Sequence, residues 1–234
     1  MTKSKFRQAL EAAVLERHCA NHPMTEKWAK GELGRAAMMG WGVEHYHWVN
    51  NYHIVNFTIA AKAPRDVIEM QLENFREEAD DDKPHIEIVL KFAAANGADV
   101  DKVRQGRGLP TTRAWRNWLF ETARNNHWVA GVASTTIGTE SQSPMLYNKV
   151  LPALREIYKF DEDAIEHFSL HVDADTEHGD AGFDVLEKHC TTSELKDMAI
   201  HFARESAQMR WFYFDGIHLH YETGYPLTAD TDRH

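Results

Sequence analysis

The chain has 234 residues, enough for one large domain with a sizeable core. Its 36 acidic residues outnumber its 26 Lys and Arg residues, and the formal net charge of −10 disfavours nucleic acid or an anionic membrane as the main partner. The two cysteines, Cys19 and Cys190, lie far apart in the sequence and outside any C-x-x-C motif, so we expect no disulfide framework and a reducing, cytoplasmic location.

In chain order, residues 1–6 lack the apolar stretch of a signal peptide, and no later run of about 18 apolar residues could cross a bilayer. Apolar residues instead recur at spacings of three and four along most of the chain, which predicts helices and no strand. The expected helical segments are residues 5–18, 25–30, 32–61, 66–78, 84–94, 100–105, 110–137, 145–158, 164–189 and 193–215.

The segment over residues 32–61 is rich in aromatic residues and poor in helix breakers. Its large side chains recur on one face, which we expect to be buried, at Trp41, His45, Trp48, Tyr52 and Val55. The whole pattern predicts an all-α fold, a bundle of about seven or eight helices. We expect one domain over residues 1–217 and an irregular tail over residues 218–234.

The most distinctive motif is an H-x-x-x-D-x-x-H pattern formed by His171, Asp175 and His178. On a helix these three side chains point within roughly 60° of one another and span about 10 Å of the axis. One ion need not contact all three residues, but two adjacent ions could share them. Imidazole and carboxylate ligands suit iron, manganese or zinc, and the absence of thiolate argues against a structural zinc site. The alternative is a polar helix face that happens to be rich in His and Asp.

Further ligands of the same type occur at Glu78 and His85, seven residues apart. Pro84 lies between them, so the helix must kink there or His85 must lie in the first turn of the next helix. Glu77 or Glu73 could take the place of Glu78 in this spacing. The alternative interpretation is a solvated acidic helix end followed by a helix that begins with proline.

Glu140, in a short segment before Ser143 and Pro144, is the last candidate ligand, and on its own it would be interpreted as a surface Glu. Two Glu, three His and one Asp could together hold two metal ions and leave positions for oxygen and substrate. Burying four or more such groups without metal would cost several kcal/mol each, so inward-facing positions would favour a metal site.

The order E-x6-H, then Glu before S-P-x-x-Y, then H-x-x-x-D-x-x-H resembles the haem-oxygenase-like diiron oxidases. That group is similar in fold to pyrroloquinoline quinone synthase and TenA, and it includes the CADD-type para-aminobenzoate synthases. The segments 22–33, 41–47 and 143–147 also resemble segments of the family, and the likeness extends from about residue 15 to 215.

The resemblance implies a haem-oxygenase-like helical fold and an O2-dependent oxidoreductase with two iron ions per chain, or a manganese and iron pair. Family members desaturate, N-oxygenate or cleave C–C bonds of amino-acid-like and fatty-acid substrates. The expected partners are therefore O2 and a small molecule, and helical relatives often form homodimers. The implied metal ligands are Glu78, His85, Glu140, His171, Asp175 and His178.

Catalytic and substrate-binding residues are also implied by position. The catalytic candidates are Tyr46, Tyr147 and Lys149, although Lys149 lies one residue from the position of the lysine in the para-aminobenzoate enzymes. The candidates for binding substrate are His45, Arg204 and Arg210, because an arginine on the last helix could clamp a carboxylate. The glutamine of the family's Gln-Tyr-Tyr motif is replaced here, with Glu44 and His45 in that region.

Two alternatives to a diiron oxidase remain. A metal-independent oxidase similar to pyrroloquinoline quinone synthase would not need a full set of six metal ligands. A non-catalytic interaction protein would keep its function when the ligand residues are replaced. The sequence does not name the substrate or separate desaturation from oxygenation.

Overall fold

The structure is a computed structural model that describes residues 3–79 and 84–228, except for the side chains of residues 173–177. Every regular element in these ranges is a helix, which confirms the all-α prediction. None of the described helices is both long enough and apolar enough to cross a bilayer. The α-helices are α1 (Lys5–Leu15), α2 (Pro23–Ala29), α3 (Arg35–Val49), α4 (Tyr52–Ala60), α5 (Arg65–Glu78), α6 (His85–Ala95), α7 (Val100–Gln105), α8 (Pro110–Asn125), α9 (Trp128–Val132), α10 (Ser143–Glu156), α11 (Glu166–His189) and α12 (Ser193–Ile217).

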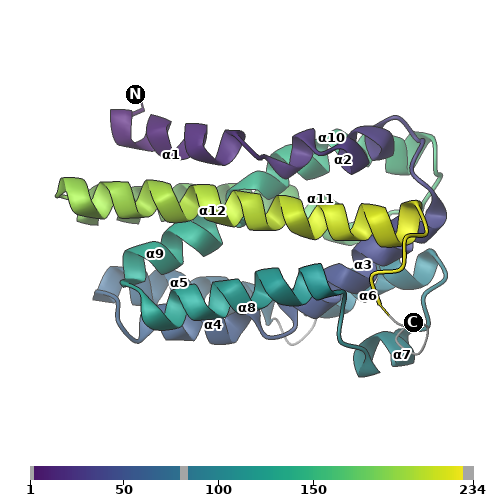
Figure 1. Cartoon of the computed structure of the whole chain (residues 1–234), viewed down its shortest axis with the longest axis horizontal. Coiled ribbons are helices and arrows are strands. Elements are labelled where there is room, and N and C mark those ends of the chain that lie inside the picture. Colours follow the sequence, from purple (N-terminus) through teal and green to yellow (C-terminus); the bar gives the residue numbers. More distant parts are fainter. Residues whose placement is uncertain (1–2, 80–83, 229–234) are drawn as a thin grey trace.

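The two longest helices, α11 and α12, run through the middle of the bundle (Figure 1). Helix α12 packs against α1 on one side and against α8 and α9 on the other. Helix α10 packs against α11 and α2, and α3 packs against α6. Segments that are far apart in the sequence therefore surround one interior.

The predicted aromatic face of the early segment is buried. Trp41 on α3 stacks on Phe168 of α11 with ring centroids 4.9 Å apart, and it meets Trp28 edge-on at 5.5 Å. The segment is not one helix, however, because α3 ends at Val49 and α4 begins at Tyr52. Consecutive asparagines at 50 and 51 separate them, and Asn favours helix ends because its side chain competes with the helical hydrogen bonds.

Helix α3 is buried on several faces, and one of them carries an acidic residue. Glu44 is fully buried and accepts hydrogen bonds from the Leu109 amide at 2.7 Å, the Thr112 hydroxyl at 2.5 Å and the Tyr221 hydroxyl at 3.0 Å. Burial raises the pKa of Glu44, while the three donors and the charge of Arg113 act in the opposite direction. This carboxyl group ties α3 to the start of α8 and to the C-terminal segment.

Two segments adopt π-helical turns that the sequence pattern does not predict. Residues 218–222, which we expected to be irregular, continue α12 as η4 (His218–Glu222). The other turn, η2 (Ala133–Ile137), follows α9, and its Gly138 amide bonds the Ala133 carbonyl five residues back at 2.8 Å. A short 3-10 helix, η3 (Glu140–Gln142), then leads into α10.

The π-helical turn η2 has two local causes. The hydroxyls of Ser134 and Thr135 bond carbonyls four residues earlier at 2.7 and 3.0 Å, a pattern that bends helices. Helix α11 also packs closely here, because a Cβ on Gly182 would collide with Thr136. The turn delivers Glu140 to the interior of the bundle, where it is only 8% exposed.

Candidate metal centre

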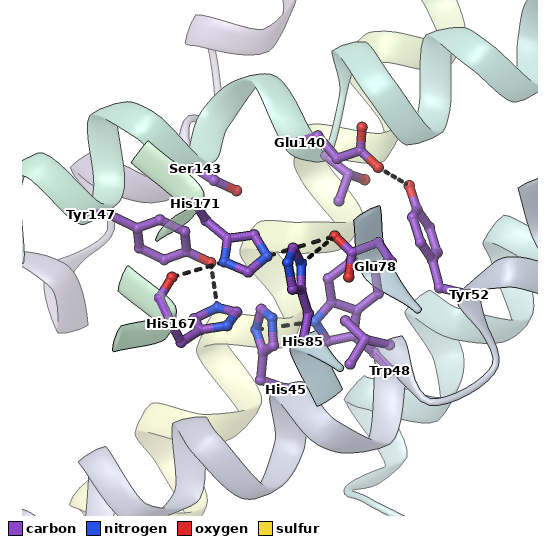
Figure 2. Close-up of a pocket in the computed structure, with 12 residues that line it drawn as sticks. His45, Trp48, Tyr52, Glu78, His85, Glu140, Ser143, Tyr147, His167 and His171 are labelled. Carbon is purple, nitrogen blue, oxygen red and sulfur yellow. Dashed lines mark hydrogen bonds and ion pairs between the residues drawn. The ribbon is translucent and has the colours of Figure 1, made fainter. Parts of the chain in front are cut away.

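A buried cavity of about 40 Å³ lies where α3, α6, α10 and α11 meet the end of α5 (Figure 2). Histidine, acidic and aromatic side chains dominate its wall, and they come from segments spread over more than 120 residues of sequence. The lining residues are His45, Trp48, Val49, Tyr52, Glu78, His85, Thr139, Glu140, Ser143, Tyr147, His167 and His171.

Three of the predicted ligands converge at this cavity. One ligand atom from each of Glu78, His85 and His171 lies within 4.8 Å of the other two. The Glu78 Oε1 atom is 3.1 Å from His85 Nδ1 and 3.6 Å from His171 Nε2, as Figure 2 shows. Glu78 ends α5 and His85 begins α6, so the proline between them separates two helices, one of the two arrangements expected from the sequence.

The local hydrogen bonds prepare His171 to bind a cation. Its Nδ1 lies 2.8 Å from the His167 carbonyl oxygen, and because a carbonyl can only accept, Nδ1 carries the proton. The Nε2 atom, 3.6 Å from Glu78, is therefore the nitrogen that could bind a cation in place of a proton. Burial acts to raise the pKa of Glu78, but hydrogen bonds and charges from His171 and His85 outweigh it and hold the pKa far below its usual range. Two imidazoles and one carboxylate in this arrangement fit iron.

Two further predicted ligands lie beside this group. Glu140 Oε1 accepts a hydrogen bond from the Tyr52 hydroxyl at 3.0 Å. The Asn74 side-chain amide nitrogen lies 3.5 Å from the same oxygen and 3.2 Å from His178 Nδ1. Because both atoms accept from one nitrogen, Glu140 and His178 face the same small volume. The other ring nitrogen of His178, Nε2, lies 2.8 Å from Glu77 Oε2.

The sixth predicted ligand, Asp175, lies on α11, but its side chain is outside the described residues. The described residues thus contain one compact group of three ligands and a neighbouring pair, Glu140 and His178. Glu140 is buried, and this placement disfavours the interpretation of it as a surface Glu.

One residue at the cavity was missed in the sequence, His167. Its ring centroid lies 4.1 Å from that of His171 and 4.7 Å from that of His45, and its Nε2 lies 3.2 Å from the Tyr147 hydroxyl. Burial lowers the pKa of both His167 and His45 well below the usual value, which favours the neutral form of both rings. The available signal was the spacing of four between His167 and His171, which places both on one helix face.

The predicted catalytic and substrate-binding residues divide into two groups. His45 and Tyr147 line the cavity, whereas Tyr46 on the same helix as His45 does not. Lys149 also lies away from it, because its ammonium group binds the Glu26 carboxylate and, at 2.8 Å, the Ala20 carbonyl.

The two arginines of α12 have different surroundings. Arg204 pairs with Glu16 at 3.0 Å at the surface. Arg210 is buried and donates to the Thr139 carbonyl and, at 3.2 Å, to the Ser143 hydroxyl. Neither arginine lines the cavity, so this geometry does not support a carboxylate clamp there.

Comparison with known proteins places the chain in a family. A family model described as an iron-containing redox enzyme matches residues 40–211. The chain belongs to this family. Its fold brings together Glu78, His85 and His171, which fit iron. The protein is an iron-containing oxidoreductase.

The chain is also similar in sequence to biosynthetic enzymes. It is 26% identical over 234 residues to a 4-aminobenzoate synthase from Nitrosomonas europaea, covering 94% of each chain. It is 22% identical over 226 residues to a pyrroloquinoline-quinone synthase from Acidiphilium cryptum, covering 94% of this chain and 91% of the relative.

Solved structures confirm the haem-oxygenase-like fold. A domain of unknown function with a heme oxygenase-like fold from Shewanella denitrificans superposes with a TM-score of 0.82 at 18% identity, covering 100% of this chain and 98% of the other. A TenA homologue from Pseudomonas syringae pv. tomato gives a TM-score of 0.80 at 12% identity, covering 91% and 92%. At these identities the likeness establishes the fold alone.

Proposed function

We propose that the protein is a non-haem diiron oxidase that uses O2 to oxidise a small amino-acid-derived or carboxylate substrate in a biosynthetic pathway. The observation that carries the proposal is the convergence of Glu78, His85 and His171 on a buried cavity, with Glu140 on its wall. Membership of the iron-containing redox family supports the choice of metal.

In this proposal Glu78, His85 and His171 hold one ion, and Glu140, His178 and Asp175 hold the second. Bound iron would supply the activation of O2, and a manganese and iron pair would suit the same ligands. The chain itself orients the ligand side chains and forms the wall of the cavity. The Tyr52 hydroxyl orients Glu140, and the His167 carbonyl sets the proton position on His171. The stacking of Trp41 on Phe168 holds α3 against α11 beside the cavity.

A second candidate function is 4-aminobenzoate synthesis, the activity named for the Nitrosomonas europaea relative. Tyr147 is one of the catalytic candidates implied by the resemblance to the family that includes the para-aminobenzoate synthases. Its position supports this candidate function, because it is buried, lines the cavity and has its hydroxyl 3.2 Å from His167 Nε2. Lys149 opposes it, since that lysine is held by Glu26 and Ala20 away from the cavity. A metal-independent oxidase or a non-catalytic protein would leave the converging ligands without a role.

The decisive test replaces one ligand, as His171→Ala. After anaerobic loading with ferrous iron, we expect about two iron ions per chain in the wild type. The variant should lose at least one of them. Its iron-dependent O2 consumption with a panel of amino acids and their derivatives should fall more than about 100-fold, since even outer contacts to a metal ligand change affinity by about 10–100-fold.

The matched control is His201→Ala, which removes an exposed histidine of α12 and should change neither quantity. Wild-type iron content and O2 consumption in His171→Ala would contradict the proposal. Full activity of a wild-type protein that never holds iron would favour the metal-independent oxidase.

A further inference from the structure

A second cavity lies at the end of the bundle where α3, α7, the start of α8 and the segment after α12 come together (Figure 1). It has a volume of about 590 Å³, and none of its described lining residues lines the cavity at the metal centre. Glu44 of α3 lines the larger cavity, whereas the next residue, His45, lines the smaller one. Two different faces of α3 therefore border the two cavities.

We call the larger one the basic cavity, because its wall carries Lys102, Arg107 and Arg113. The side chain of Arg107 forms no ion pair or hydrogen bond with any described residue. Arg113 donates to the Gly108 carbonyl at 2.7 Å and, within the described part of the chain, forms no ion pair. Lys102 lies 3.8 Å from Asp99 at the surface. In a chain with an excess of acidic residues, two guanidinium groups thus face one cavity without a described acid in contact.

These guanidinium groups also repel one another. Burial lowers the pKa of the neighbouring Arg116, and the charges of Arg113 and Arg107 act in the same direction. The loop that carries Arg107 is held against α3, because Gly108 has a φ of +72° or less, at +70°, and a Cβ there would lie 2.9 Å from the Cβ of His47. Like charges fixed close together attract an anion, which offsets their repulsion.

The wall also includes one carboxylate, Glu44, whose charge opposes the binding of an anion. Both of its oxygens already accept hydrogen bonds, from Leu109, Thr112 and Tyr221. Three cationic side chains outnumber this carboxylate on the wall. The imidazole of His220, on the same wall, supplies a further charge when it is protonated. The balance of charge at the cavity therefore favours an anionic ligand.

The size of the basic cavity indicates an organic ligand. Its volume of about 590 Å³ is typical of small-molecule sites, which span about 300–1,000 Å³, and part of the wall is apolar, at Ala36, Met39 and Leu109. A phosphate monoester carries up to about two negative charges near neutral pH, which suits two guanidinium groups better than a single carboxylate does. We propose that the basic cavity binds a small organic phosphate, with the phosphate group at Arg107 and Arg113 and the carbon part against Met39.

The test compares two probes that differ only in the phosphate group, 4-fluorophenyl phosphate and 4-fluorophenol. Binding of each to the full chain without added metal is followed by fluorine NMR at about pH 7.5, where the phosphate is mostly doubly charged. We expect the phosphate to bind at least about tenfold more tightly than the phenol. Raising the salt concentration from about 50 to 200 mM should weaken only the binding of the phosphate. Equal affinities for the two probes would overturn the proposal.

Three variants at exposed positions locate the phosphate, and each makes the net charge more negative by one. Arg107→Gln should weaken binding of the phosphate about three- to tenfold and leave the phenol unchanged. Ala36→Glu adds a carboxylate to the wall and should have an effect of at least that size. Arg124→Gln is the matched control, because Arg124 lies on the same helix as Arg113 but about 16 Å along the axis, and it should change the affinity less than about twofold.

Phosphate binding that Arg107→Gln and Ala36→Glu both leave intact would overturn the proposal. Loss of binding in His171→Ala, with full binding in Arg107→Gln, would place the phosphate at the metal centre and would also overturn it. Sedimentation of the protein with vesicles of phosphatidic acid and phosphatidylcholine, without binding of the soluble phosphate, would assign the basic cavity to a membrane surface and contradict a small-molecule ligand. The measurements need no iron, so their outcome is independent of the diiron proposal.

Discussion

Tyr52 shows how one hydroxyl group can set the position of a metal ligand. It begins α4, is 8% exposed, and donates to Glu140 Oε1 across 88 residues of sequence. Periodicity placed Tyr52 on a buried face, but neither residue's surroundings in the sequence indicated the contact. Partners of this kind fix the orientation of a ligand and raise its affinity for metal.

Tyr52→Phe should therefore weaken iron binding without unfolding the chain. We expect a loss of about tenfold or more in affinity, because Glu140 would lose one of the hydrogen bonds that orient it while Phe keeps the packing of the ring. The measurement is a ferrous iron titration against a competing chelator. Tyr158→Phe removes a hydroxyl that bonds Leu33 instead, and equal losses in both variants would show that the Glu140 contact is unimportant.

The arginines mark the limit of sequence reasoning for single residues. Arg204 and Arg210 lie on the same helix, six residues apart, and both were candidates for binding substrate. The sequence cannot tell them apart, because the difference arises from what packs against α12: Glu16 meets Arg204, and the Thr139 carbonyl meets Arg210. His167 was missed although its spacing of four from His171 places both on one helix face, and only the packing of α3 shows that His45 lies beside it.

Among the elements, α11 depends on close contact with the π-helical turn η2. Two of its glycines face this region, Gly179 and Gly182. A Cβ on Gly182 would collide with Thr136 and lie 3.2 Å from Ile137, whereas a Cβ on Gly179 would meet Ser141 at an ordinary 3.4 Å. The same chemical change should thus have opposite effects at two positions on one helix.

We expect Gly182→Ala to lower the free energy of unfolding by about 1–3 kcal/mol, because overpacking forces α11 and η2 apart. Gly179→Ala should be neutral or stabilise the chain by about 0.5–1 kcal/mol, as alanine favours helix. Urea unfolding of both variants beside the wild type measures the two effects. A Gly182→Ala protein as stable as Gly179→Ala would show that the close contact is not maintained.

The sequence predicted elements well where one periodic pattern governed them. The aromatic face that begins at Trp41 and the helix that carries His171 were both expected, because their spacing of three and four needs no tertiary information. The break at residues 50–51 and the turn η2 were not expected. The turn coincides with the hydroxyl groups of Ser134 and Thr135, which bond carbonyls four residues earlier, and the break lies at two consecutive asparagines.

At the scale of the whole molecule, several buried histidines make stability depend on pH. Burial lowers the pKa of His18 to about 4, and the charges of Arg210 and Lys149 add to the effect. Burial also lowers the pKa of His22, His45 and His167. The unfolded chain binds protons near pH 6.5, so the stabilisation is complete above that pH and is lost as pH falls toward 4.

His18→Asn should reduce this loss. Asparagine can still accept the hydrogen bond that His18 Nδ1 accepts from the Ala20 amide, but it does not titrate. Between pH 7 and pH 5 we expect the variant to lose about 2 kcal/mol less stability than the wild type. Denaturant unfolding at the two pH values measures the difference. A variant with the same pH slope as the wild type, or a shallower slope in His201→Asn as well, would contradict the explanation.

The candidate centre as a whole was predictable in its residue types and less so in its arrangement. The spacing of seven indicated metal chemistry at two places. It puts His171 and His178 on one face of a helix, and it puts Glu78 and His85 on the two sides of a helix junction. The division into a compact group of three and a neighbouring pair joined by Asn74 was not predictable, because it depends on how α5 meets α11.

The π-helical turn η2 has a consequence for how this chain should be aligned with others. One extra residue in a turn shifts the rotational phase of everything after it by about 100°. A homologous chain with an ordinary helix here could present its glutamate in the same direction only if it were one residue shorter. The number of residues between α9 and Glu140 is thus free to vary by one, provided that the winding of the backbone changes with it, and a single-residue gap at this point would preserve the direction of the glutamate.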